Sequence, residues 1–221
     1  MAQTITPTAT AAVRDAERAV AAAEVAALQA VVEWAAEHRV ENDEVTEESF
    51  GDNGVLLGGV GCPLVSEFDV YDLAATLGRS SQSGCDLVAK TLELRYRLHR
   101  TWERVVALEV PKWKAFKVAE ATMNLSWEAA AYIDTMLAPV LHSCSFAQID
   151  RTIAIGIDLH DPEEAERRRT KAADDRCFDV HLHRRGGSTD GTVEVTGCLD
   201  LLDALDLEDA VKKGAKALGD L

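Results

Sequence analysis

Apolar residues recur at three- and four-residue steps along most of this 221-residue chain, and this period most constrains its fold. It is the period of an amphipathic α-helix. Between about Thr10 and Arg39, one such stripe comprises Val13, Ala16, Val20, Ala23, Ala27, Val31 and Trp34. The period changes to two only over residues 177–199. We therefore expect a mainly α, multi-helix bundle with one β-hairpin near the C-terminal end, followed by a final helix.

The domain organisation follows from the same patterns. Residues 1–40 are expected to form one long helix, and residues 41–66 an acidic and glycine-rich loop. Residues 67–221 are expected to form a helical domain that includes the hairpin, at about 177–199. The small residues of the first helix suit close packing on this domain, so we expect a single domain.

Capping signals divide the helical domain further. Ser80 or Ser81 is expected to begin a helix that runs to about Glu109, because a proline follows. Ser145 and Gln148 have the spacing of a capping box, which predicts another helix start.

The charge balance limits the partners. Thirty-eight acidic residues against 23 basic residues give a net charge of −15, which opposes nucleic-acid binding over the whole surface. The longest uncharged run tested, Val55 to Ser66, is too short to span a bilayer. Five cysteines without a C-x-x-C pair indicate free thiols in a reducing compartment. We expect a cytoplasmic protein with no membrane partner.

One stretch departs from the acidic average. Residues 90–117 hold eight basic residues against three acidic ones, with aromatic residues between them. A basic face of this kind can contact phosphates. The alternative is that these cations pair with acidic residues of the same chain. The candidate DNA contacts are Arg97, Arg100, Arg104, Lys112, Lys114 and Lys117.

Metal and catalytic signals are weak. Cys177, His181 and His183 alternate and would share a strand face, but no fourth ligand is evident at a fitting spacing. The sequence contains no G-x-S-x-G or H-E-x-x-H motif. We predict neither a metal site nor a catalytic site in this chain.

A series of short motifs carries a family resemblance. It runs in order through Gly58–Pro63, Leu77–Ser80, Glu93–Leu98, Val110–Ala115, Asp161–Arg169 and Asp190–Gly197. Through these motifs the chain resembles the N-terminal domain of unknown function, number 222, of the 13E12 repeat family. The resemblance covers about residues 15–221 and is strongest from residue 58 onward.

The resemblance implies a position beside a nuclease. In that family the domain commonly precedes an HNH endonuclease module, so it implies a non-catalytic domain that positions the nuclease on DNA or on a partner. Neither a histidine nor an asparagine follows His183, so the hairpin is not itself an HNH module. Such a module, with its divalent metal, would lie beyond Leu221. We expect no cofactor in this chain.

A second function remains open. The alanine-rich first helix and the net charge of −15 also suit a protein-interaction or dimerisation module with no direct DNA contact. Self-association would then use the N-terminal helix.

Overall fold

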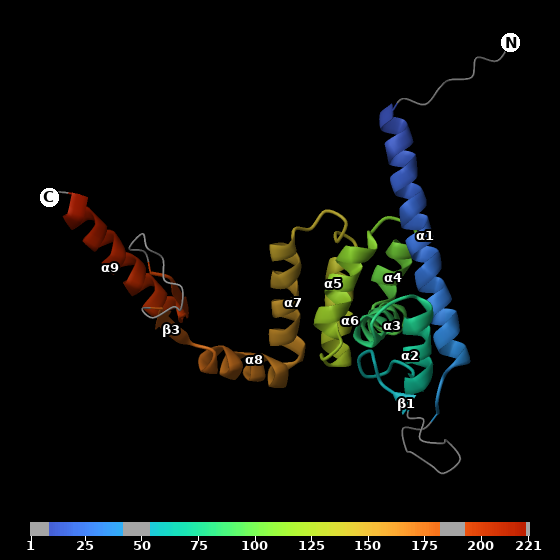
Figure 1. The fold of residues 1–221 in the computed structure, drawn as a ribbon. Helices are drawn as coiled ribbons and strands as arrows, with labels where there is room; N and C mark the ends of the chain where they lie inside the picture. The colour runs from blue at the N-terminus through green and yellow to red at the C-terminus, as the bar shows by residue number, and fades with distance from the viewer. Residues whose placement is uncertain (1–8, 42–53, 182–192, 220–221) are drawn as a thin grey trace. The chain divides into compact units, whose positions relative to one another are not determined.

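The computed structural model describes residues 9–41, 54–181 and 193–219, and the chain divides into two compact units, Met1–Pro162 and Glu163–Leu221 (Figure 1). The expectation of a mainly α, multi-helix fold with a C-terminal hairpin and a final helix is confirmed. The expected domain 67–221 extends through both units.

The first unit contains α1 (Ala9–Glu37), β1 (Gly54–Val55), β2 (Val65–Ser66), α2 (Glu67–Thr76), α3 (Ser81–Tyr96), α4 (His99–Val106), α5 (Lys112–Thr122), α6 (Trp127–Leu137) and α7 (Phe146–His160).

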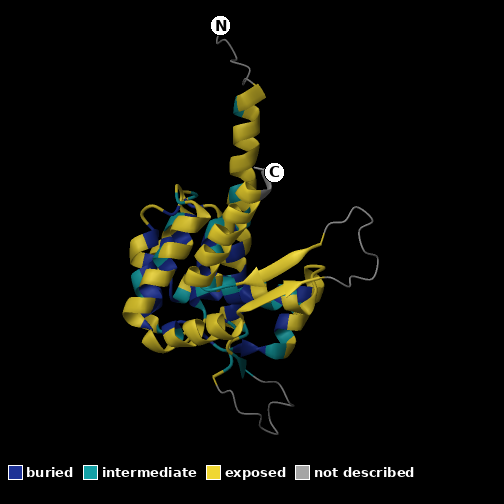
Figure 2. Cartoon of the chain, turned by 90° about the vertical axis from the view of Figure 1, so that its left-hand side faces the viewer, coloured by how far each residue is buried: buried dark blue, intermediate teal, exposed yellow. Residues whose placement is uncertain are grey.

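The core of the first unit is built around α3. This helix packs against α1, α2, α4 and α5, while α6 packs against α4 and α7. Leu92 and Leu94 of α3 and Ile133 of α6 are fully buried. A side chain at Gly156 of α7 would meet Ile133 at 2.6 Å, so glycine permits the close approach of α6 and α7. Figure 2 shows the buried residues on the inner faces of these helices.

The structure corrects the single helix expected from Ser80 or Ser81 to about Glu109. Ser80 does cap α3, through a hydrogen bond from the Ser83 N–H to its hydroxyl. The helix ends at Tyr96, and α4 begins at His99. Leu98 lies between them with a non-helical backbone and a fully buried side chain. Burial of this side chain therefore accompanies a break that helical periodicity alone does not reveal.

Helix α1 is only partly packed. Its C-terminal half buries Val25, Leu28, Val31 and Ala35, at helical spacing. Its N-terminal half is exposed, and Val20 keeps 59% of its surface open (Figure 2). The expected stripe is buried only in part: Val31 is buried and Trp34 is partly buried, whereas Val20, Ala23 and Ala27 are exposed.

Helix α1 also has the length and apolar composition of a membrane span. Among the described residues it alone has both properties. Core helices of water-soluble proteins and signal sequences share these two properties.

Two short strands lie within residues 41–66, which the sequence predicts to be a loop throughout. Residues 42–53 of that loop lie outside the described residues. Strands β1 and β2 are antiparallel, with Gly54 opposite Ser66 and Val55 opposite Val65. Sequence analysis missed them because two residues are too few to show an alternation. The N–H of Ser66 also donates to the carbonyl of His38 at 3.1 Å, which links β2 to the end of α1.

The second unit contains short elements with exposed surfaces. These are α8 (Pro162–Asp174), which begins at the boundary, β3 (Cys177–Val180), β4 (Val195–Cys198) and α9 (Leu201–Gly219). Strands β3 and β4 are antiparallel, and Ala165 of α8 is the buried residue among those described in this unit. The hairpin and the final helix are thus present, but their apolar side chains are not gathered into a core.

Candidate functional site

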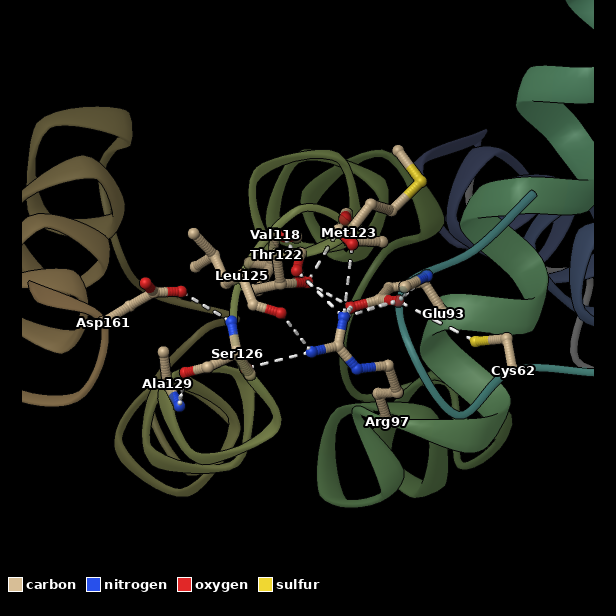
Figure 3. Close-up of polar contacts among 12 residues, drawn as sticks. Cys62, Glu93, Arg97, Val118, Thr122, Met123, Leu125, Ser126, Ala129 and Asp161 are labelled. Carbon is tan, nitrogen blue, oxygen red and sulfur yellow. Dashed lines mark hydrogen bonds and ion pairs between the residues drawn. The ribbon is translucent and has the colours of Figure 1, made fainter. Parts of the chain in front are cut away.

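Arg97, a candidate DNA contact, is buried at the end of α3. Its side chain and that of Glu93, one turn earlier, are both 0% exposed and form an ion pair at 3.0 Å. The Thr122 hydroxyl donates to Glu93 at 2.8 Å, and the Gly59 N–H donates to it at 2.9 Å. Figure 3 shows the carboxylate and the guanidinium facing each other inside the bundle.

The guanidinium of Arg97 also closes the end of α5. Its two terminal nitrogens donate to the carbonyl of Thr122, the last residue of α5, at 3.0 Å, and to the carbonyls of Leu125 at 2.7 Å and Ser126 at 2.9 Å in the connection to α6 (Figure 3). Carbonyls at a helix C-terminus have no partner within their helix, so a cation satisfies them and complements the helix dipole. These bonds direct the charge inward. Arg97 is therefore removed from the set of candidate DNA contacts.

The other candidate cations mostly have intramolecular partners. Arg104 pairs with Glu109 at 2.7 Å. Lys112 of α5 pairs with Glu24 of α1 at 2.7 Å, and Lys117 pairs with Asp150 of α7 at 3.1 Å. The Lys114 amine donates to the carbonyls of Leu141, His142 and Cys144, at 2.7 to 3.2 Å. These partners agree with the alternative in which the basic stretch neutralises acidic residues and helix ends of the same chain.

Arg100 differs from the rest of the set. It is exposed at the start of α4, and within residues 9–41, 54–181 and 193–219 its side chain has no ion-pair partner. The six candidates are therefore not brought together as one free cationic face. Arg97 and Arg100 also lie on two different helical segments, because α3 and α4 are separate.

Asp134 is an important residue that sequence analysis missed. This α6 residue is 4% exposed. Its carboxylate accepts the backbone N–H groups of Arg100 and Thr101, both at 2.9 Å, and the Thr101 hydroxyl at 2.7 Å. It therefore caps the N-terminus of α4 from a neighbouring helix. A carboxylate in the middle of an amphipathic helix offered no sequence signal for this role.

Cys62 is buried beside the Glu93–Arg97 pair (Figure 3). Burial, and then the negative charge of Glu93, raises the pKa of its thiol to about 12. Its Sγ lies 3.9 Å from a Glu93 oxygen. A thiol with so high a pKa is almost entirely protonated at neutral pH and is a poor nucleophile.

The candidate metal ligands of the sequence analysis do not form a metal site within the described residues. Cys177 and His181 belong to the β3 region, whereas His183 lies outside the described residues. His181 Nε2 lies 2.9 Å from the Thr196 hydroxyl oxygen. Within the described ranges no group of three or more His, Cys, Asp or Glu residues has a geometry that could hold a metal ion.

The second unit presents an exposed apolar surface. On the hairpin, Phe178 and Val180 alternate with polar residues, and Val180 lies opposite Val195. Directly opposed residues of an antiparallel pair point to the same face, so these side chains share one face. We define the C-terminal apolar surface as Phe178, Val180, Val193, Val195, Leu201, Leu202, Leu205, Leu207 and Val211, whose exposed fractions run from 39% to 75%.

Helix α9 separates its charges along its length. The acidic residues lie in its first half and the basic residues in its second half. At the start of the helix, the Asp200 carboxylate accepts the Asp203 N–H at 2.9 Å and pairs with Arg176 at 2.8 Å. The acidic residues are Asp203, Asp206, Glu208 and Asp209, and the basic residues are Lys212, Lys213 and Lys216.

Comparisons with known proteins add no relative: no family model, no curated protein and no solved structure matches this chain. The resemblance to the 13E12 repeat family stays a prediction from the sequence.

Proposed function

We propose that this chain is a protein-interaction module that associates with a second copy of itself through the C-terminal apolar surface. The exposure of that surface carries the proposal. Leu201 and Leu202 keep 75% and 74% of their surface open, and the described residues of both hairpin strands are exposed. Gathered apolar side chains on a protein surface are typical of interaction sites.

The charges of α9 favour a second copy as the occupant. Two antiparallel α9 helices place the acidic half of each beside the basic half of the other, whereas a parallel pair places like charges together. One broad face of α9 would form the contact between the two helices. It carries Leu201, Leu205, Leu207 and Val211.

Charge reversal in α9 tests this proposal. One variant carries Lys212→Glu, Lys213→Glu and Lys216→Glu, and the other carries Asp203→Lys, Asp206→Lys and Asp209→Lys. Each variant alone is expected to self-associate at least about tenfold more weakly than the wild type, because like charges then face one another. An equimolar mixture is expected to recover association. Sedimentation equilibrium of the full chain measures both results.

Two controls separate this surface from others. Reversal of Arg167, Arg168 and Arg169 to Glu in α8 changes the same number of charges and is expected to leave association unchanged. Val13→Lys with Val20→Lys tests the exposed half of α1, the surface expected from the sequence. A wild type that is monomeric at every concentration would overturn the proposal. Loss of association only in the α1 variant would show that the chain self-associates through α1 instead.

We propose a second role, the positioning of an associated nuclease on DNA, on the strength of one exposed cation. The side chain of Arg100 is exposed and forms no ion pair among the described residues, and the family resemblance implies this role. Duplex DNA titrated at two salt concentrations tests it. Binding is expected to weaken with salt and with Arg100→Glu, but not with Arg167→Glu. Absence of binding at low salt would exclude direct DNA contact.

A further inference from the structure

The two cysteines of the hairpin lie directly opposite each other. In the register of β3 and β4, Cys177 is the cross-strand partner of Cys198, at the end of the ladder next to α8 and α9. Directly opposed side chains in an antiparallel pair extend from the same face of the sheet. Both cysteines are exposed. Two accessible thiols therefore lie opposite each other on the same face of the hairpin.

The spacing of the ladder suits a bond between these sulfurs. The His181 N–H donates to the carbonyl of Glu194 at 3.0 Å, so this pair is hydrogen-bonded, and the alternation along the ladder makes the Cys177–Cys198 pair hydrogen-bonded too. The Cα atoms of such a pair lie about 5.5 Å apart. Disulfides most often join Cα atoms about 5.5–6 Å apart, so the Cα spacing fits, and the Cβ atoms, about 5.5 Å apart in a hydrogen-bonded pair, must approach by about 1 Å.

An ion pair holds the same end of the hairpin together. Arg176 precedes Cys177, Asp200 follows two residues after Cys198, and the two charges lie 2.8 Å apart. Asp200 is itself fixed by the N–H of Asp203 at 2.9 Å. The two chain segments are thus joined on both sides of the cysteine pair, by the ladder and by this contact.

The other cysteines are less available. Cys62 is buried in the first unit, and Cys85 and Cys144 are half-buried. Burial raises the pKa of the thiols of Cys62 and Cys85, which lowers their thiolate fractions. Oxidants in solution should therefore reach Cys177 and Cys198 first.

We propose that Cys177 and Cys198 form a reversible intramolecular disulfide by exchange with a low-molecular-weight disulfide. One cysteine thiolate attacks a sulfur of that disulfide, which breaks the S–S bond and releases one small thiolate. The second cysteine thiolate then attacks the protein sulfur of the mixed disulfide and releases the second small thiolate. The two protons lost by the cysteines are taken up by the two released thiolates, which become thiols. The protein dithiol is oxidised by two electrons, and the small disulfide is reduced by two.

This disulfide would close the base of the hairpin. It would join the residues that follow α8 to those that precede α9, and would restrict the chain between residues 177 and 198. In a reducing compartment such a bond would be transient and would report the redox state.

Oxidised glutathione added to the reduced full chain tests the proposal. The intact mass is expected to fall by two hydrogen atoms, and peptide mapping is expected to find Cys177 linked to Cys198. Dithiothreitol is expected to reverse both changes. Hydrogen exchange of the amides in β3 and β4 is expected to slow on oxidation, which is a readout independent of mass.

Three variants make the test specific. Cys177→Ser and Cys198→Ser are each expected to accumulate one glutathione adduct at the remaining hairpin cysteine, because the second attack is lost. Cys198→Ser combined with Thr196→Cys moves the thiol to a diagonal position, about 7–8 Å away between Cα atoms, and is expected to cross-link far more slowly. Glutathione adducts at both native cysteines without a cross-link, or disulfides only between molecules, would overturn the proposal.

Discussion

Glu93 and Arg97 place their charges inside the fold, whereas most of the other ion pairs of the described residues are at the surface. Glu93 and Arg97 are completely buried, and removal of two ions from water is costly unless their hydrogen bonds are satisfied. Here the carboxylate receives bonds from Gly59 and Thr122, and both terminal nitrogens of the guanidinium donate to backbone carbonyls, while its buried Nε has no hydrogen-bond partner among the described residues. The space is tight as well, because a side chain at Gly59 would meet an Arg97 nitrogen at 1.7 Å. The pair is thus part of the packing of the bundle.

The first prediction concerns this pair. Arg97→Met is expected to lower the free energy of unfolding by about 3–5 kcal/mol, because it leaves a buried carboxylate without its cation. Urea unfolding measures the change. Arg97→Lys keeps the charge and should lose less. Arg95→Met, at an exposed position of the same helix, should change stability by no more than about 0.5 kcal/mol. Wild-type stability of Arg97→Met would show that the pair is dispensable.

At the scale of elements, helices in the first unit satisfy one another's ends. Asp134 of α6 caps the N-terminus of α4, and Arg97 donates to the carbonyl of Thr122 at the C-terminus of α5. Asp161, after α7, accepts the N–H of Ser126 at the start of α6, at 2.6 Å. Each of these bonds joins residues at least 25 positions apart, so the helix boundaries depend on the assembled bundle.

The second prediction concerns the cap of α4. Asp134→Ala is expected to cost about 1–3 kcal/mol of unfolding free energy, because the Arg100 and Thr101 N–H groups lose their acceptor. Asp150→Ala is the matched control, since its pair with Lys117 is largely exposed and should contribute at most about 1 kcal/mol. Thermal and urea unfolding compare the two variants. Equal effects of both changes would argue against a special role for Asp134.

The third prediction concerns the pH dependence at the start of α9. The hydrogen bond from the Asp203 N–H holds the pKa of Asp200 below its ordinary value, and the Arg176 charge acts in the same direction. The folded form therefore favours the ionised carboxylate. Its contribution is fully present above the unfolded pKa of about 3.9 and is lost as pH falls through the lowered folded value.

NMR titration of the Asp203 amide measures this dependence. Its resonance is expected to move with an apparent pKa below that of an ordinary aspartate. In Asp200→Asn that transition should disappear, because the amide does not titrate. A transition at or above the ordinary aspartate value would contradict the assignment.

At the scale of the whole molecule, burial is concentrated in one unit. Among the described residues, the buried apolar side chains lie within residues 9–162, with Ala165 as the exception. The exposed side chains of β3, β4 and α9 form no comparable core. Since apolar burial is the main stabilising contribution in small domains, the first unit holds most of the folding free energy.

The fourth prediction tests this division. A chain that ends after Pro162 is expected to retain one cooperative unfolding transition and a strongly helical circular dichroism spectrum. It keeps Asp161, and with it the bond to Ser126. The complementary fragment, residues 163–221, is expected to unfold without a cooperative transition because it lacks a buried core. A non-cooperative transition in the longer fragment would contradict the division.

The sequence by itself determined the fold class, because helical periodicity and caps such as Ser80, Ser126 and Ser145 act between neighbouring residues. It also determined the C-terminal hairpin, whose alternation is local. Only the tertiary structure decided where the cations point. Arg97 and Arg100 look alike in sequence, yet contacts with residues more than 20 positions away bury one and leave the other exposed. The same long-range contacts divided α3 from α4, since the acceptor that starts α4 is a carboxylate of α6.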